Sequence, residues 1–213
     1  MLKVLKIEII SLIIILVAPV ASAQVLYRIS SNSTAAPSYI LATNKLMDMS
    51  FIDTIPNVFK CFSNCNKVIT EFAMQDYEAI AELRQAALLP DSIRLSNFYT
   101  EEQYKAINDA LVINLGMGLE QLGRMKPAYL TEMFRNELLK KWLDYNDERS
   151  METFFEAVAI QNNTPIYGLD NIKETMYMIF DREPFHWQCE ELYKIIEYPE
   201  REVSFERSIL EMY

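Results

Sequence analysis

The chain has 213 residues, 51% of them hydrophobic, and a formal net charge of -10, with a sequence pI of about 4.7. This acidic balance argues against nucleic acid as a partner, because its phosphates would be repelled, and against binding to an anionic membrane surface. The length and the apolar content suit one globular domain with a sizeable core.

Residues 1–23 predict a secretory signal peptide rather than a part of the fold. Two lysines precede an apolar run from Ile9 to Val20, and the small residues Ala21-Ser22-Ala23 follow it. A basic segment, an apolar segment and an A-x-A site in this order are typical of a cleaved signal. We therefore expect cleavage after Ala23, a mature domain over residues 24–213, no stable membrane span after cleavage, and a secreted or periplasmic location. A retained anchor is the alternative, although the apolar run is shorter than the ~20 residues of a spanning helix.

Short strands alternate with helices along the rest of the chain. The strand segments are rich in β-branched and aromatic residues, and two helices begin at clear N-caps, Ser150 and the capping box of Thr100 with Gln103. The predicted strands are 25–30, 38–42, 67–72 and 164–169. The predicted helices are 50–65, 76–89, 100–115, 127–143, 150–161, 172–180, 184–197 and 200–213. This alternation predicts an α/β or α+β domain, a mixed β-sheet flanked by helices.

The sequence lacks the residue patterns of several common nucleotide-binding and catalytic sites. There is no G-x-G-x-x-G, P-loop or G-x-S-x-G pattern in a fitting context. The single histidine, His186, lies among aromatic residues, so a packed or surface histidine is favoured over a catalytic one. For Cys61, Cys65 and Cys189 we favour three buried free thiols. The alternatives are a bridge from Cys189 to one of the others, or a zinc site with His186.

One group of charged residues follows the predicted strands. Lys45 comes after the second strand, Glu71 ends the third, and Asp170 comes after the fourth. In open α/β sheets, ligands bind at the carboxyl ends of the strands. If these strands are parallel neighbours, one cation and two carboxylates converge there; the alternative is that all three are solvated loop charges.

Segments spread over nearly all of residues 24–213 carry a family resemblance. They are 26–30 (LYRIS), 37–43 (PSYILAT), 50–56 (SFIDTIP), 67–71 (KVITE), 116–122 (GMGLEQL) followed by Lys126-Pro127, and 165–170 (PIYGLD). In this order and spacing the chain resembles the TraB/GumN family, which includes the Tiki-like secreted metalloproteases, and is most similar to forms from gut and environmental Bacteroidetes. The resemblance implies an α/β fold similar to those of erythromycin esterase and the haem-binding ChaN-like proteins.

The resemblance also implies a divalent-metal site made by two G-x-x-H motifs and a glutamate. The first motif falls on Ala42, Thr43, Asn44 and Lys45, so that alanine replaces the glycine and lysine replaces the histidine. The glutamate falls on Glu71, and the family's Gly-Leu-Glu ends here in Asp170. We find no second G-x-x-H motif, and we expect the family's C-terminal strands to be missing.

The chemistry of lysine sets the functional expectation. A lysine ammonium has no lone pair for a metal, so we expect no metal and no other cofactor, and we hypothesise that a Lys45–Glu71 ion pair replaces the metal. The main interpretation is a secreted protein with a degenerate, catalytically inactive site, in which Glu71 and Asp170 are the remaining catalytic-type residues. Its role would be to bind a protein or peptide partner, or a second copy of itself. The alternatives are a metal-dependent peptidase or other hydrolase, and a non-functional fragment.

Overall fold

The computed structural model describes residues 24–33, 36–44, 46–71, 77–143 and 150–211. Helices and short strands alternate along these residues, which confirms the predicted α/β or α+β class. The chain divides into two compact units, one ending at Ala42 and the other beginning at Thr43. The predicted signal peptide lies outside the described residues.

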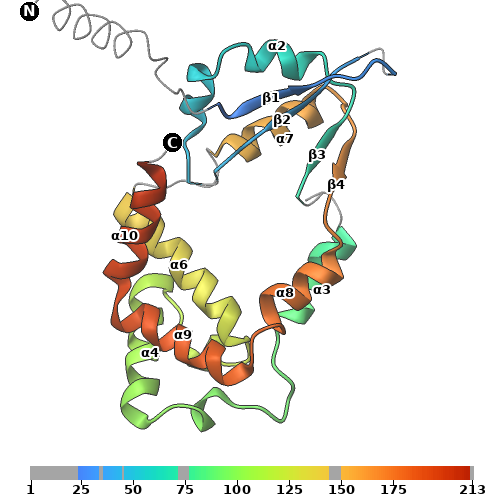
Figure 1. Ribbon diagram of the computed structural model, residues 1–213. Helices are drawn as coiled ribbons and strands as arrows, with labels where there is room; N and C mark the ends of the chain where they lie inside the picture. The colour runs from blue at the N-terminus through green and yellow to red at the C-terminus, as the bar shows by residue number, and fades with distance from the viewer. Residues whose placement is uncertain (1–23, 34–35, 45, 72–76, 144–149, 212–213) are drawn as a thin grey trace, which may run out of the picture. The chain divides into compact units, whose positions relative to one another are not determined.

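The first unit is a β-hairpin. Strands β1 (Leu26–Ile29) and β2 (Ser38–Leu41) pair antiparallel, with Leu26 opposite Leu41 and Ile29 opposite Ser38. Ala42 extends the ladder by donating its backbone N–H to the carbonyl of Val25 at 2.8 Å. Both strands are where the sequence predicts them, and they lie side by side in Figure 1.

The second unit begins with two short helices in the segment 50–65, which the sequence predicts to be mostly helical with Pro56 near its start. A 3-10 helix, η1, spans Met49–Thr54, and α2 spans Val58–Ser63. Between them Ile55 is extended and Asn57 adopts a left-handed conformation with φ of 62°. Pro56 accounts for the break, because proline lacks an N–H and disfavours helical geometry at the preceding residue. The prediction that residues 50–65 are mostly helical is thus confirmed, with an interruption at residues 55–57.

The second sheet is a parallel pair. Strands β3 (Val68–Thr70) and β4 (Ile166–Gly168) pair in register, with Ile69 opposite Tyr167 (Figure 1). Helix α7 (Met151–Gln161) contacts β4. Among the described residues the strands thus form two separate two-stranded sheets, where the sequence predicted one mixed sheet.

Aromatic side chains join α2 to α7. The rings of Phe62 and Phe155 have centroids 4.8 Å apart, and those of Phe59 and Phe154 are 6.0 Å apart in an edge-to-face arrangement. Such pairs contribute beyond the area that they bury. They hold α7 in place as the helix that supports the parallel strands.

Most of the remaining helices pack around one apolar core. Leu111, Leu130 and Leu192 are fully buried at its centre. The helices and short helical turns are α3 (Tyr77–Ala86), η2 (Leu95–Asn97), α4 (Glu101–Leu115), α5 (Leu119–Leu122), α6 (Pro127–Leu143), α8 (Ile172–Phe180), α9 (Phe185–Glu197) and α10 (Pro199–Leu210). Helix α4 begins at the predicted capping box, in which Thr100 and Gln103 bond each other's backbone N–H. None of the described helices combines the length and the apolar character needed to cross a bilayer.

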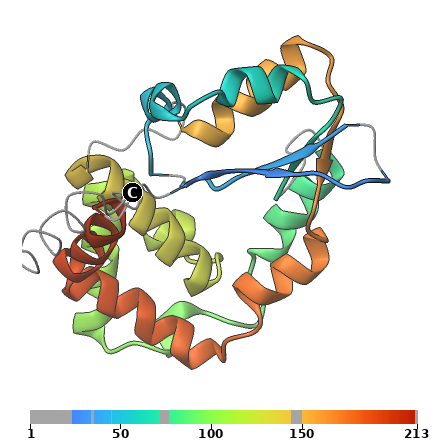
Figure 2. The ribbon, with the colours of Figure 1, turned by 45° about the horizontal axis from the view of Figure 1, so that its top comes forward.

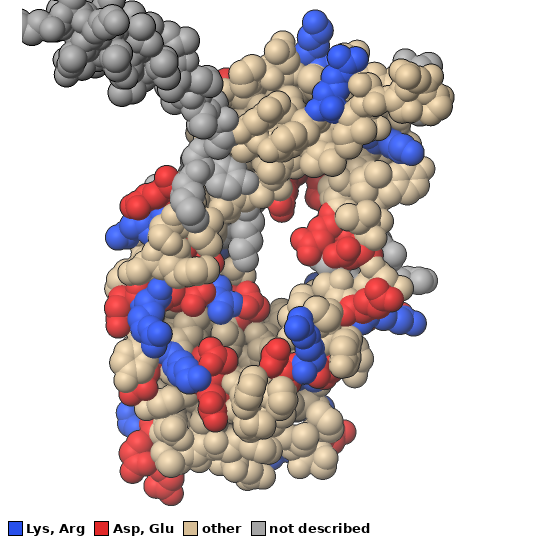
Figure 3. Space-filling model, viewed as in Figure 1, with Lys and Arg blue, Asp and Glu red and all other residues tan. Residues whose placement is uncertain are grey.

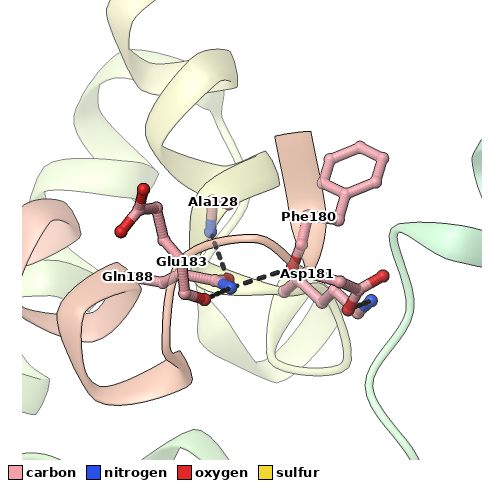
Figure 4. A network of polar contacts seen from close by, with 6 residues as sticks. Ala128, Phe180, Asp181, Glu183 and Gln188 are labelled. Atoms are coloured by element: carbon pink, nitrogen blue, oxygen red, sulfur yellow. Dashed lines mark hydrogen bonds and ion pairs between the residues drawn. The ribbon is translucent and has the colours of Figure 1, made fainter. Parts of the chain in front are cut away.

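A buried glutamine joins α6, α8 and α9 (Figure 4). Gln188 donates through Nε2 to the carbonyl oxygens of Phe180, at 2.8 Å, and Glu183, at 2.9 Å. Its Oε1 accepts a hydrogen bond from the N–H of Ala128. Since buried backbone groups need partners, one side chain here satisfies three of them and fixes the turn between α8 and α9.

Helices α3 and α8 lie side by side in both ribbon views (Figure 2). Ala87, Met176 and Phe180 are buried between them as a second, smaller apolar cluster. Because α8 follows β4 directly, this packing fixes the chain just beyond the carboxyl end of the parallel sheet.

Candidate functional site

The parallel strands β3 and β4 bring two of the predicted site residues to the carboxyl end of their sheet. Beyond Thr70, the N–H of Leu169 donates to the Thr70 carbonyl at 2.8 Å, and the N–H of Asp170 donates to the Glu71 carbonyl at 3.1 Å. Glu71 and Asp170 therefore leave the sheet together, which confirms that their strands are parallel neighbours. Both residues are exposed. Acidic side chains gather where β3 and β4 end in Figure 3.

The motif at the end of β2 has a different environment. Its strand, β2, pairs antiparallel with β1. Ala42 is exposed and closes the hairpin. Lys45 lies outside the described residues.

Two polar residues of this motif make local contacts. Thr43 donates its hydroxyl to a carboxylate oxygen of Glu152 at 2.6 Å. Asn44 accepts the N–H of Leu46 on its side-chain oxygen at 2.9 Å, and its carbonyl accepts the N–H of Met47. Asparagine commonly folds a turn in this way. Both side chains thus have structural partners in the positions where the family resemblance implies part of a metal site.

Sequence reasoning missed two acidic residues on α7. Glu152 and Glu156 are four residues apart, so they lie on one face of the helix, and Glu156 accepts a hydrogen bond from the side chain of Thr70. Burial and the neighbouring Glu152 carboxylate raise the pKa of Glu156 above its usual range, and the Thr70 bond acts in the opposite direction. The four-residue spacing was visible in the sequence, but not the fact that this helix supports β3.

Thr70 lies between Glu71, which follows it in the chain, and Glu156 on α7, to which it is hydrogen-bonded. It is the last residue of β3 and is half-buried, whereas the next residue, Glu71, is exposed. Successive side chains of a strand point to opposite faces. The carboxylate of Glu156 therefore lies at the half-buried side of β3, whereas Glu71 follows the strand and is exposed.

The other candidate groups do not join this region. His186 is exposed on α9, with its ring edge-to-face against Trp187. The three cysteines are free thiols, as favoured from the sequence, but only Cys189 is buried, whereas Cys61 and Cys65 are half-buried. Burial raises the pKa of Cys65 and of Cys189, so that both thiols stay protonated and weakly nucleophilic at neutral pH.

The acidic side chains of this region are possible metal donors. Within the part of the chain that the structure describes, no three histidine, cysteine, aspartate or glutamate side chains converge as a metal site would require. Glu71, Asp170, Glu152 and Glu156 are hard oxygen donors of the kind that suits Mg²⁺, Ca²⁺ or Mn²⁺. Glu152 and Glu156 belong to α7, whereas Glu71 and Asp170 follow β3 and β4.

Comparison with known proteins gives one match. The family model described as the TraB/PrgY/gumN family matches residues 25–213. No curated protein sequence and no solved structure matches the chain. The matched range covers both compact units from β1 onward.

Proposed function

We propose that the chain, which belongs to the TraB/PrgY/gumN family, is a secreted or periplasmic member with a degenerate metal site. In this proposal it acts by binding a protein or peptide and not by catalysis. The observation that carries the proposal is the motif Ala42-Thr43-Asn44-Lys45. The resemblance implies a histidine at the last of these positions. Lysine there offers a positive charge and no lone pair.

The contacts around the motif support this proposal. Thr43 is bonded to Glu152, and Asn44 folds the turn that follows. In a metal site, neighbouring polar side chains usually orient the ligands. Here they bond α7 and the local backbone, so the segment has a structural role that needs no metal.

Charge compensation is the second part of the proposal. Glu71 and Asp170 follow the two strands at the carboxyl end of the parallel pair, where a nearby cation would favour their ionised forms. We propose that the ammonium of Lys45 supplies this cation by pairing with Glu71. Lys45 would then supply the positive charge that a bound metal supplies in a catalytic relative.

A metal-dependent hydrolase is the second candidate function. Glu71 keeps the family's glutamate, and α7 adds Glu152 and the more basic carboxylate of Glu156. A carboxylate with a raised pKa is suited to general acid or base work. This function would need a metal held by carboxylates or by a second chain, so metal binding separates the two candidates.

Metal content and thermal unfolding test the proposal together. The purified protein is analysed for bound metals and melted with and without Zn²⁺, Mn²⁺ and Co²⁺. We expect no stoichiometric metal and an unchanged melting temperature. Near-stoichiometric metal with a raised melting temperature would support the hydrolase instead, because a ligand that binds only the native state stabilises it.

A further inference from the structure

Strand β3 has one edge without a strand partner among the described residues, since it pairs with β4 alone. Val68 donates its N–H to the carbonyl of Pro165 at 2.9 Å, and the carbonyl of Thr70 accepts the N–H of Leu169. Both of these residues therefore direct backbone groups toward β4. Because alternate residues of a strand direct these groups to opposite edges, Ile69 directs its N–H and C=O away from β4.

One face of this small sheet is also uncovered. Ile69 is 57% exposed, and Tyr167, its partner in register on β4, is 55% exposed. Lys67 and Glu71 are exposed as well, whereas Val68 and Thr70 between them are half-buried. Parallel sheets are ordinarily covered on both faces, and open strand edges pair readily with other strands. The exposed edge and face of β3 thus have the properties of a binding surface.

The segment 67–71, Lys-Val-Ile-Thr-Glu, is complementary in charge to itself when read in the opposite direction. Two copies paired antiparallel about Ile69 place Lys67 of each copy opposite Glu71 of the other. They also place the two Ile69 residues opposite each other, where each can give its N–H to the other's carbonyl. Opposite charges that face each other across neighbouring strands stabilise the pairing.

We propose that the β3 edge is the interface of a homodimer, formed by antiparallel pairing of β3 with β3 of a second copy about Ile69, so that the side chains of Lys67 and Glu71 of the two copies face each other. The two parallel pairs then become one four-stranded sheet, with a two-fold axis at Ile69. Such an interface uses the same surface on both copies and closes on itself. Its exposed face carries a continuous apolar stripe of Tyr167 and Ile69 from both copies.

This inference does not rest on the proposed loss of the metal. Lys67 lies outside the candidate metal site, so its substitution probes the strand edge alone. A monomeric protein could still lack a metal, and a dimer could still bind one. Lys67→Glu is therefore the variant that separates the two proposals, because Glu71→Lys also changes the candidate metal site.

Charge reversal at the strand edge gives the decisive test, read by sedimentation equilibrium over a micromolar to millimolar range. We expect the unsubstituted protein to dimerise. Lys67→Glu places Glu opposite Glu71 twice, and Glu71→Lys places Lys opposite Lys67 twice. Each variant should raise the dimer dissociation constant by about tenfold or more. An equimolar mixture of the two variants restores opposite charges at both positions and should form heterodimers.

Two further variants sharpen the result. Lys173→Glu makes the same charge change at an exposed position on α8 and should leave dimerisation unchanged. Ile69→Lys places like charges on the two-fold axis and should give a monomer. Circular dichroism verifies that each variant is folded; the substituted side chains are exposed, so the helical signal should be retained.

Three results would overturn the proposal. The first is a protein that stays monomeric over the whole range. The second is a dimer that Lys67→Glu and Ile69→Lys leave unchanged. The third is a mixture of folded Lys67→Glu and Glu71→Lys variants that does not associate.

Discussion

The hydroxyl of Thr43 donates a 2.6 Å hydrogen bond to the carboxylate of Glu152 on α7. This bond joins the segment after β2 to the helix that supports the parallel strands. A second bond, between Thr70 and Glu156 one helical turn further along α7, joins the end of β3 to the same helix. The acidic face of α7 thus fixes two segments of the candidate site by accepting threonine hydrogen bonds.

Loss of the Thr43 hydroxyl should destabilise the protein modestly. Thr43→Val keeps the shape of the side chain and removes the donor to Glu152. We expect a decrease of about 0.5–1 kcal/mol in the free energy of unfolding, because the carboxylate is exposed and regains water. Urea denaturation measures the change. Glu152→Gln keeps an acceptor oxygen and should cost less; an unchanged stability of Thr43→Val would mean that the bond contributes nothing.

The carboxylate of Glu156 should lower stability at neutral pH. Its folded-state pKa is raised, so the native state holds this proton more tightly than the unfolded state does. The resulting penalty is absent below the pKa of the unfolded state and complete above the raised folded pKa. Stability therefore falls as the pH rises through that window.

Glu156→Gln removes the charge and keeps an acceptor for Thr70. It should raise the free energy of unfolding at neutral pH by about 0.5 kcal/mol, a small value because the group is largely solvated. The gain should disappear near pH 4, where the unfolded carboxyl is itself becoming protonated. Denaturation at both pH values measures it, with exposed Glu82→Gln on α3 as the control. An equal gain at both pH values would contradict a titration origin.

Gln188 should be among the costliest polar residues to replace. Gln188→Leu leaves the carbonyls of Phe180 and Glu183 and the N–H of Ala128 without this partner. We expect a loss of about 2–4 kcal/mol in the free energy of unfolding, since unsatisfied buried groups retain their desolvation cost. Gln161→Leu, at an exposed position on α7, is the matched control. If both substitutions had similarly small effects on the free energy of unfolding in denaturant melts, the hydrogen bonds of Gln188 would not be needed for stability.

The proposed ion pair predicts a role for Lys45. Lys45→Ala should lower the melting temperature, because Glu71 would lose its cation while Asp170 remains nearby. Lys60→Ala, an exposed lysine on α2, should have little effect. Differential scanning calorimetry compares the two variants. An unchanged melting temperature for Lys45→Ala would argue against the pair.

Secretion is tested at the N-terminus of the protein. Expressed in a Gram-negative host with its first 23 residues, the chain should be found outside the cytoplasm, with Gln24 as its first residue. Intact-mass measurement of the periplasmic and cytoplasmic fractions reads this directly. Uncleaved protein that stays with the membrane fraction would favour the retained anchor.

Much of the secondary structure could be predicted because its signals are local. The capping box of Thr100 and Gln103 and the cap at Ser150 begin their helices as expected. Residues 50–65 are mostly helical as expected, and Pro56 separates the two short helices. Local sequence signals thus set the positions of most helices and strands, and Pro56 interrupts one helical segment.

The candidate site could be predicted only in part. The sequence placed Glu71 and Asp170 at strand ends, and the pairing of β3 with β4 confirms that they share one edge. The sequence did not show that α7 supports β3 and contributes Glu156. These relationships depend on which apolar faces pack together, here through Phe62 and Phe155, and no short pattern in the sequence encodes them.

Metal binding is the most direct test of the central claim, that this family member has lost its metal site. Isothermal titration calorimetry of the purified, metal-free protein with Zn²⁺, Mn²⁺ and Co²⁺ measures it, and a Lys45→His variant is titrated beside it. We expect no saturable binding of these metals to the unsubstituted protein. Saturable binding near one equivalent, lost on Glu71→Ala or Asp170→Ala, would contradict it and identify a working metal centre at the ends of β3 and β4.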